Sequence, residues 1–452
     1  MTASRGAILY AVMALLIVAV GYFQSWNVAL NLLNFCLISA IMSLGVNIQW
    51  GYAGLFNVGI VGFAALGGIA AVLTAMPPVR GAWEAGGVGI GLALLALVTT
   101  VAAVVLAGRV TPPRWRRLAM IVIGVFGFFA IRRVFDPAVD AIEHFNAART
   151  GYLGGFGLPV LLSWIVGGVL AAAAAWLVGK ISLGLRSDYL AIATLGISEI
   201  IIAMIKNEDW LTRGVKNVTG LPRPVPIEID LQQAPWFLDI AGLIGADPVI
   251  FSSIFVKICY ALLFVVVLVI LMWLAEKALN SPWGRMMRAI RDNRDAAEAM
   301  GKDVTRRHLQ VFILGSAVVG IAGAMMTTLD GQLTPSSYNP LRFTFLIWVM
   351  VIVGGSGNNW GAVLGGFLIW FVWVEAEPAG IWLMNAVTAG LDPASPVRAH
   401  LLDAAPHMRL FLMGLILLLM LRFAPAGLIP ERSAQPRGAG PAAAKAAEAP
   451  DA

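Results

Sequence analysis

Long apolar runs recur along the whole chain, and short polar connections separate them. A helix needs roughly 20 apolar residues to cross a bilayer core of about 30 Å. The runs lack the polar face that a buried helix of a soluble protein shows to water. The pattern therefore predicts an all-α, polytopic membrane protein with crossings at 7–24, 28–48, 54–76, 88–107, 118–134, 158–179, 188–206, 253–275, 309–329, 343–354, 361–375 and 408–423.

Three of these crossings are weaker than the others. The run at 118–134 is expected to be cut short by Arg132 and Arg133. The runs at 343–354 and 361–375 are short and are joined through glycines, so we read them as half-helices. The expected number of membrane-spanning helices is therefore about ten to twelve.

The charges of the loops predict the topology, because cytoplasmic loops carry an excess of Lys and Arg. Loop 276–308 has eight Lys or Arg residues, and loop 207–252 has three against six acids. We therefore place 276–308 in the cytoplasm and 207–252 outside, where its segment 234–244 is expected to form a short interfacial helix. The same rule places both termini in the cytoplasm.

A membrane-spanning domain of residues 1–430 is expected to be followed by a different kind of segment at 431–452. That segment is rich in Ala, Pro and Gly and has no bulky apolar residues, so it is predicted to be a disordered cytoplasmic tail. The insert at 109–157 has no assignment from the sequence.

The composition argues against several classes of function. The chain is 59% apolar and 12% charged, and its net charge of +6 is explained by basic loops rather than by a nucleic-acid partner. Its four histidines have no metal-ligand spacing, and no Gly-Lys pair is followed by the Ser or Thr of a Walker A motif. We therefore expect no enzyme activity, no metal and no cofactor bound by this chain.

Two segments are dense in glycine, at 50–68 and 354–367. Small residues on one helix face, such as Gly357, Gly361 and Gly365, let helices approach closely in lipid. Two glycine-interrupted segments, one in each half of the chain, also fit an inverted repeat with a transport path at its interface. Both readings stay open at the level of sequence.

Nine of the seventeen residues at 291–307 are charged, in the middle of an apolar chain. Upstream and within this stretch, Met286, Ile290, Ala297 and Met300 fall at helical spacing. We predict a short amphipathic helix on the cytoplasmic side, with Gly301 as its C-cap. A solvated loop helix is the alternative.

Asp295-Ala296-Ala297-x-x-x-Gly301 resembles the EAA loop of ABC importer permeases. Residues 281–326, 187–207, 50–68 and 353–366 together resemble the branched-chain amino-acid ABC permeases, the LivM-like subunit. The resemblance implies a fold of the ABC importer permease type in a bacterial inner membrane. It also implies two ATPase subunits that use ATP, a homologous second permease, a periplasmic solute-binding protein and contact with membrane lipid. The ATPase-coupling residues would be Arg288, Arg291, Asp295, Ala296, Ala297 and Gly301.

A zwitterionic amino acid needs a donor for its carboxylate and an acceptor for its ammonium group. Candidates for such a path are Asn57, Gly59, Gly62, Thr194, Ser198 and Glu199, with Asn47 nearby. The alternative is that these polar groups only bond one helix to another. A branched-chain amino acid, urea, an amide or an aromatic acid all remain possible substrates. An ion-coupled secondary transporter of a small organic solute is the rival function, and Glu199 would be its ionisable group.

Overall fold

A computed structural model describes residues 2–146, 150–392 and 395–431. In these residues ten helices are long and apolar enough to cross a membrane. The prediction of an all-α, polytopic membrane protein is confirmed. The ten are α1 (Thr2–Phe23), α2 (Trp26–Ala53), α4 to α5 (Arg80–Val110), α6 (Pro113–His144), α7 (Val160–Ser182), α8 (Ser187–Asn207), α12 (Pro248–Asn280), α15 (Val304–Asp330), α17 (Asn359–Val387) and α18 to α19 (Pro396–Phe423).

Two shorter apolar helices complete the body: α3 (Ile60–Ala75), and α16 (Leu346–Gly354) with the π-helical turn η3 (Leu341–Phe345) before it. The prediction of a short helix at 343–354 is confirmed. The expected crossing at 54–76 starts later, at Ile60, because residues 54–59 are not helical.

The prediction that 361–375 is a half-helix is wrong. Helix α17 has 29 residues and continues through Pro378. Its glycines serve helix packing instead of ending the helix: a Cβ on Gly361 or Gly366 would meet the backbone of Gly354 or Ala40 within 3.0 Å.

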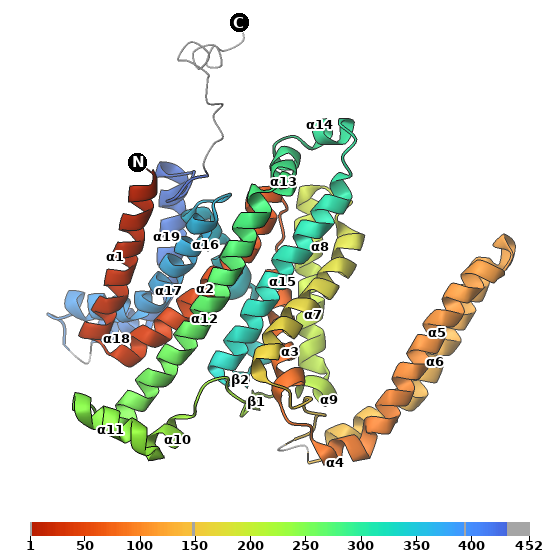
Figure 1. The fold of residues 1–452 in the computed structure, drawn as a ribbon, viewed down its shortest axis with the longest axis horizontal. Helices are drawn as coiled ribbons and strands as arrows, with labels where there is room; N and C mark the ends of the chain where they lie inside the picture. The colour runs from red at the N-terminus through yellow and green to blue at the C-terminus, as the bar shows by residue number, and fades with distance from the viewer. Residues whose placement is uncertain (1, 147–149, 393–394, 432–452) are drawn as a thin grey trace, which may run out of the picture.

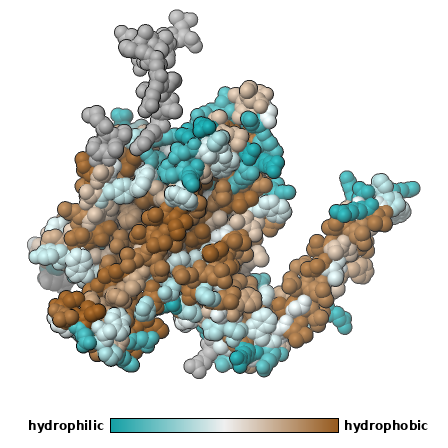
Figure 2. Space-filling model, in the orientation of Figure 1, coloured by the Kyte–Doolittle hydropathy of each residue, from teal (hydrophilic) through white to brown (hydrophobic). Residues whose placement is uncertain are grey.

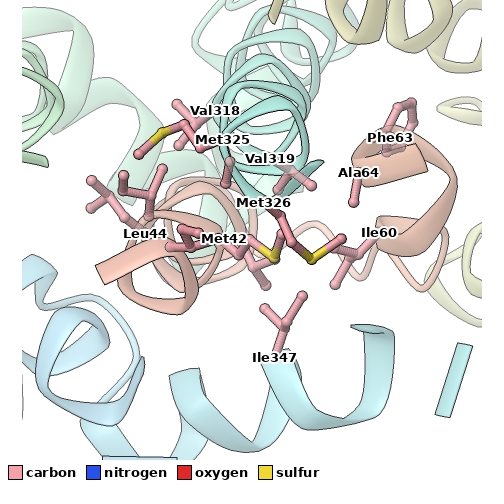
Figure 3. Close-up of a cluster of buried hydrophobic side chains, with 14 of the residues drawn as sticks. Met42, Leu44, Ile60, Phe63, Ala64, Val318, Val319, Met325, Met326 and Ile347 are labelled. Atoms are coloured by element: carbon pink, nitrogen blue, oxygen red, sulfur yellow. The ribbon is translucent and has the colours of Figure 1, made fainter. Parts of the chain in front are cut away.

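The core lies where α2 and α15 cross, and α3, α7, α16 and α17 pack around them (Figure 1). In the most apolar 18-residue window of each helix, 72% of the residues of α2 and 67% of the residues of α15 are buried inside the protein. These two helices therefore face other helices, whereas most other spans face lipid on one side. Figure 3 shows Met42 and Leu44 of α2 against Val318, Val319 and Met325 of α15.

The core contains two helix pairs that run in opposite directions. Helix α2 ends at Gly54 in the left-handed region, and a non-helical segment leads to the short helix α3. Helix α15 ends in the same way at Gly331, and residues 331–340 lead to η3 and α16. This is the pattern of an inverted repeat. The segment that matches the break at 54–59 is 331–340, not the glycine-dense 354–367 expected from the sequence.

Helices α5 and α6 form a hairpin that projects away from the body (Figure 1). Only 6% and 0% of their most apolar windows are buried, and Figure 2 shows the hairpin apolar along its length with hydrophilic ends. The expectation that Arg132 and Arg133 cut the crossing short is wrong. Arg132 pairs with Asp136 one turn further along the same helix, at 2.9 Å, and α6 continues to His144.

The short helices and strands outside the long spans gather at two opposite ends of the long helices (Figure 1). We call them the α13 end, with α13 (Pro282–Asp292), α14 (Arg294–Ala299) and the start of α1, and the α11 end. The α11 end holds α9 (Asp209–Thr212), α10 (Glu228–Gln233), α11 (Pro235–Ile244) and the strands β1 (Val218–Thr219) and β2 (Gln332–Leu333), which pair antiparallel. Helix α11 confirms the short helix predicted at 234–244. Of the tail predicted at 431–452, only Glu431 is among the described residues.

Candidate coupling site and transport path

The non-helical segment 54–59 is held in place by buried side chains of four helices. Asn57 donates from Nδ2 to Gln49 Oε1 at 2.9 Å, and its Oδ1 accepts from the Gly59 amide at 2.9 Å. Gln49 itself donates to the Phe312 carbonyl and to Ser316 Oγ at 2.9 and 3.0 Å. Asn57 thus satisfies one backbone amide of the segment and is joined through Gln49 to α15.

Aromatic rings cover the same segment. Trp348 of α16 donates from Nε1 to the Asn57 carbonyl at 3.0 Å. Its ring lies 4.7 Å from that of Phe56 and 5.3 Å from that of Trp50. Segment 54–59 therefore connects α2 and α3 to α16, and a movement of α16 would change its surroundings.

Thr194 and Ser198 lie one turn apart on α8, and both face the start of α3. Thr194 Oγ1 accepts from the Val58 amide at 3.1 Å, and Ser198 Oγ accepts from the Gly62 amide at 2.9 Å. Gly59 and Gly62 allow this close approach: a Cβ on Gly62 would lie 2.8 Å from Ser198 Oγ. The geometry is that of helix-to-helix hydrogen bonds, so a role of these four residues in the path stays a prediction.

Glu199 follows Ser198 on α8 but is exposed on the outside of this chain. It lies near the middle of a helix of 21 residues, and so near the middle of the membrane. An ionised carboxylate facing lipid at this depth costs about 2.5–3.5 kcal/mol or more. Something polar outside this chain is therefore expected to cover it.

A second break, at residues 355–358, lies between α16 and α17. Asn47 of α2 accepts from the Gly357 amide at 2.9 Å and donates to Asn359 Oδ1 at 3.0 Å. Asn359 in turn donates to Glu276 of α12 at 3.1 Å. Asn47 thus bonds helix to helix, as the alternative reading of the sequence had it.

The charged stretch forms two short helices, and the prediction of a single helix is wrong. Asn293 is extended (φ −152°) between α13 and α14, and its side chain accepts from the Ala296 amide to start α14. The predicted apolar stripe is also only partly right. Ile290 and Ala297 are buried, but Met300 is 79% exposed. Gly301 has φ +75° and accommodates the left-handed end of α14, which confirms the predicted cap.

The two helices divide the predicted coupling residues into two groups. Asp295, Ala296 and Gly301 are exposed and face away from the body. Arg288 and Arg291 turn inward. Arg288 donates to the Leu279 carbonyl at 3.1 Å, and Arg291 donates to the Gly51 carbonyl and to Glu431 Oε2.

Arg291 joins three parts of the chain that are far apart in sequence. Gly51 lies in the last turn of α2, before segment 54–59, and Glu431 follows the stretch 428–429 that pairs with Val353 and Gly354. Burial lowers the pKa of Arg291, but hydrogen bonds and charges from Glu431 and Asp292 outweigh it and hold that pKa above its ordinary value. The guanidinium therefore remains charged and links α13 to both breaks in the core.

A protein family described as "Branched-chain amino acid transport system / permease component" matches residues 117–421. The chain belongs to this permease family. It is 26% identical over 401 residues to a probable branched-chain amino acid transport permease protein LivM of Methanocaldococcus jannaschii, which covers 87% of this chain and 90% of the relative. It is 27% identical over 257 residues to a high-affinity LivM permease protein of Escherichia coli, which covers 55% of this chain and 56% of that relative. No solved structure matches the chain.

The family match confirms the resemblance seen in the sequence and makes the chain a multi-pass membrane permease. Sequence reasoning missed two permease residues that the structure places at the breaks, Gln49 and Trp348. Gln49 is polar inside an apolar run, and such a residue in a membrane helix is a signal in its own right. Trp348 carries no such signal, because a tryptophan in an apolar helix is ordinary.

Proposed function

We propose that this chain is a transmembrane subunit of an ABC importer that moves branched-chain or related hydrophobic amino acids across a bacterial inner membrane. Two separate ATPase subunits drive it, and the α13 end with both termini faces the cytoplasm. The relative from Methanocaldococcus jannaschii, which matches along nearly the whole chain, supports the substrate class. The observation that carries the coupling role is the helix pair α13–α14, exposed on one side and tied to the core on the other.

The proposed coupling step follows the contacts of Arg291. An ATPase subunit binds the exposed face of α14, which holds Asp295, Ala296 and Met300. When that subunit moves α14, the adjacent helix α13 moves as well. The movement then reaches the body of the protein, because Met287 and Ile290 of α13 are buried. Arg291 then transmits the displacement to Gly51 and Glu431, which adjoin the two breaks in the core.

The homologous second permease chain is proposed to cover the α8 face that holds Glu199. A lipid-facing carboxylate at the centre of the membrane is costly, whereas a polar group of a neighbouring helix would satisfy it. The exposed side chains around it, Ile192, Leu195 and Ile200, give this face the apolar area of a helix contact. In this proposal Glu199 contributes to the contact between the two permease chains and is not needed for coupling to an ion gradient.

The periplasmic solute-binding protein is proposed to deliver the amino acid at the α11 end. Loop 207–252 is ordered there by the β1–β2 pair, and by an ion pair of 2.9 Å between Arg223 and Glu228. Strand β2 directly precedes the segment that leads to η3 and α16. Binding of the solute-binding protein to loop 207–252 is thus linked through β2 to the start of α16.

The coupling role is tested with Gly301→Glu and a matched control, Gly245→Glu. Both glycines have positive φ (+75° and +68°), cap a short helix and have open space around a Cβ. Backbone strain is therefore similar, but Gly301 lies at the α13 end and Gly245 at the α11 end. We expect Gly301→Glu to abolish both co-purification of the ATPases and ATP-driven leucine uptake, whereas Gly245→Glu retains the ATPases.

Insertion of both variants is checked by their amount in the membrane fraction. Normal leucine uptake by a well-inserted Gly301→Glu variant would refute the coupling role. Absence of ATP-dependent leucine uptake by the unmodified complex would refute the proposed substrate.

A further inference from the structure

A small cavity lies in the core between α2, α15, α16 and α17. Its volume is about 10 Å³, and most of its lining is apolar, including Ile38, Met42, Met326 and Ile347. Figure 3 shows Met42, Met326 and Ile347 converging from three different helices. Polar groups reach it only from Ser39, Arg342 and Trp370.

Two of these polar groups are hydrogen-bond donors without an acceptor. Arg342 Nε and Trp370 Nε1 are both buried and have no hydrogen-bond partner among the described residues. The Arg342 guanidinium instead lies over the rings of Phe343 and Trp370, with distances of 5.1 and 5.2 Å to their centroids. Leaving buried donors unpaired is costly, so the site suits an anionic acceptor.

The neighbouring arginine is a useful contrast. Arg409 also lies over a tryptophan of α17, Trp373, and its Nε likewise has no hydrogen-bond partner among the described residues, but its charge is paired with Glu377. Among the described residues Arg342 has no such ion pair, although the negative charge of Asp330 acts on it. Asp330 lies one turn beyond Met326 on the same face of α15, where it is exposed and outside the lining of the closed cavity.

The cavity is closed in this state of the protein. A volume of about 10 Å³ holds at most one water molecule, so a larger ligand can enter only if α16 moves away from α2 and α15. The π-helical turn η3 and the non-helical residues before it make the start of α16 irregular. Methionines on three of the facing helices can repack around different shapes.

We propose that this cavity is the collapsed form of a binding site for an aliphatic amino acid in transit. Arg342 and Trp370 bind the carboxylate, Asp330 attracts the ammonium group, and Met42, Met326 and Ile347 enclose the branched side chain. The assignment rests on the proposed function for its substrate class, but the site itself is defined by the unpaired donors and the apolar walls.

The first test measures ATP-driven leucine uptake by the complete complex in proteoliposomes. Arg342→Gln is expected to raise KM for leucine about tenfold or more, since it removes a charge-assisted hydrogen bond. The control replaces Arg409 and Glu377 together by Gln, which removes a neighbouring, partly buried arginine without leaving a lone charge, and should leave KM within about twofold. An unchanged KM in Arg342→Gln would overturn the proposal.

A second variant tests the apolar wall. Met326→Ala enlarges the cavity, so uptake of phenylalanine relative to leucine is expected to rise severalfold. A variant that is only destabilised would lose both substrates equally. An unchanged ratio in an active variant would contradict the placement of the side chain.

A third measurement does not depend on transport. Ile347→Cys, in a chain whose Cys36 and Cys259 are replaced by Ser, is treated with N-ethylmaleimide while the complex turns over ATP. Leucine should slow the labelling, and leucinamide, which lacks the carboxylate, should not. Equal labelling with and without leucine, or no labelling at all, would refute the site. If leucine protects the cysteine from labelling but the complex takes up no leucine, only the proposed import is refuted and the binding site stands.

Discussion

Replacing Asn57 by Leu tests whether segment 54–59 is held by its polar network. The side chain of Asn57 is 2% exposed, and it makes two hydrogen bonds of 2.9 Å. Its loss leaves Gln49 Oε1 and the Gly59 amide without these partners. Each buried group left unsatisfied costs about 1–3 kcal/mol, so we expect Asn57→Leu to lower the free energy of unfolding by about 2–4 kcal/mol.

A double-mutant cycle separates this network from a general loss of packing. In a Gln49→Leu background, one of the two lost partners is already gone, so Asn57→Leu should cost less by about 1–2 kcal/mol. Unfolding is followed in mixed micelles by tryptophan fluorescence, to which Trp348 contributes because it donates to the Asn57 carbonyl.

Asn207→Leu is the matched control for the polarity change. Asn207 is at the end of α8, and its amide bonds only to the Ala203 carbonyl of its own helix, at 2.7 Å. It should change stability by less than about 1 kcal/mol. A cost of Asn57→Leu that is equally small, or identical in both backgrounds, would refute the reasoning.

The remaining predictions concern close packing and topology. Gly62→Ala is expected to destabilise the protein by about 1–3 kcal/mol in the same assay, because its Cβ would lie 2.8 Å from Ser198 Oγ. The control Gly124→Ala, which has open space around its Cβ, should be neutral or slightly stabilising. Equal effects of the two substitutions would count against the packing argument. Met300→Cys and Leu243→Cys, at positions 79% and 87% exposed, should be labelled by a membrane-impermeant thiol reagent only from the cytoplasmic side and only from the outside, respectively; the reverse pattern would invert the proposed topology.

Much of the fold follows from the sequence for simple reasons. A bilayer allows its hydrocarbon core to be crossed only by segments that satisfy their own backbone, so apolar length alone located most spans, including α7, α8, α12 and α15. The errors occurred where a local signal was weaker than tertiary context. Arg132 and Arg133 did not end α6, and the glycines of α17 did not break it, because exposed charges and close helix contacts each explain those residues without a break.

The candidate coupling site was recognisable from a motif, whereas its division into two helices was not. Asp295, Ala296 and Gly301 are neighbours in sequence, and a short pattern describes them. That Arg291 binds Gly51 and Glu431, residues that are 240 and 140 positions away, depends on how α2 and the C-terminal stretch pack against α13. No local pattern encodes such contacts.

By itself the sequence determined the membrane class, the approximate positions of the spans and the permease family, and it predicts the side of each charged loop. These properties depend on transfer between water and lipid and on short motifs, and both are local in the chain. Only the tertiary structure decided which polar groups are already paired and which are not. Thr194, Ser198 and Asn57 are hydrogen-bonded between segments of the chain, and their role in the path stays a prediction, whereas the unpaired donors of Arg342 and Trp370 went unnoticed. The reason is physical: whether a buried donor has a partner depends on atoms brought within about 3 Å by the packing of helices that are distant in sequence.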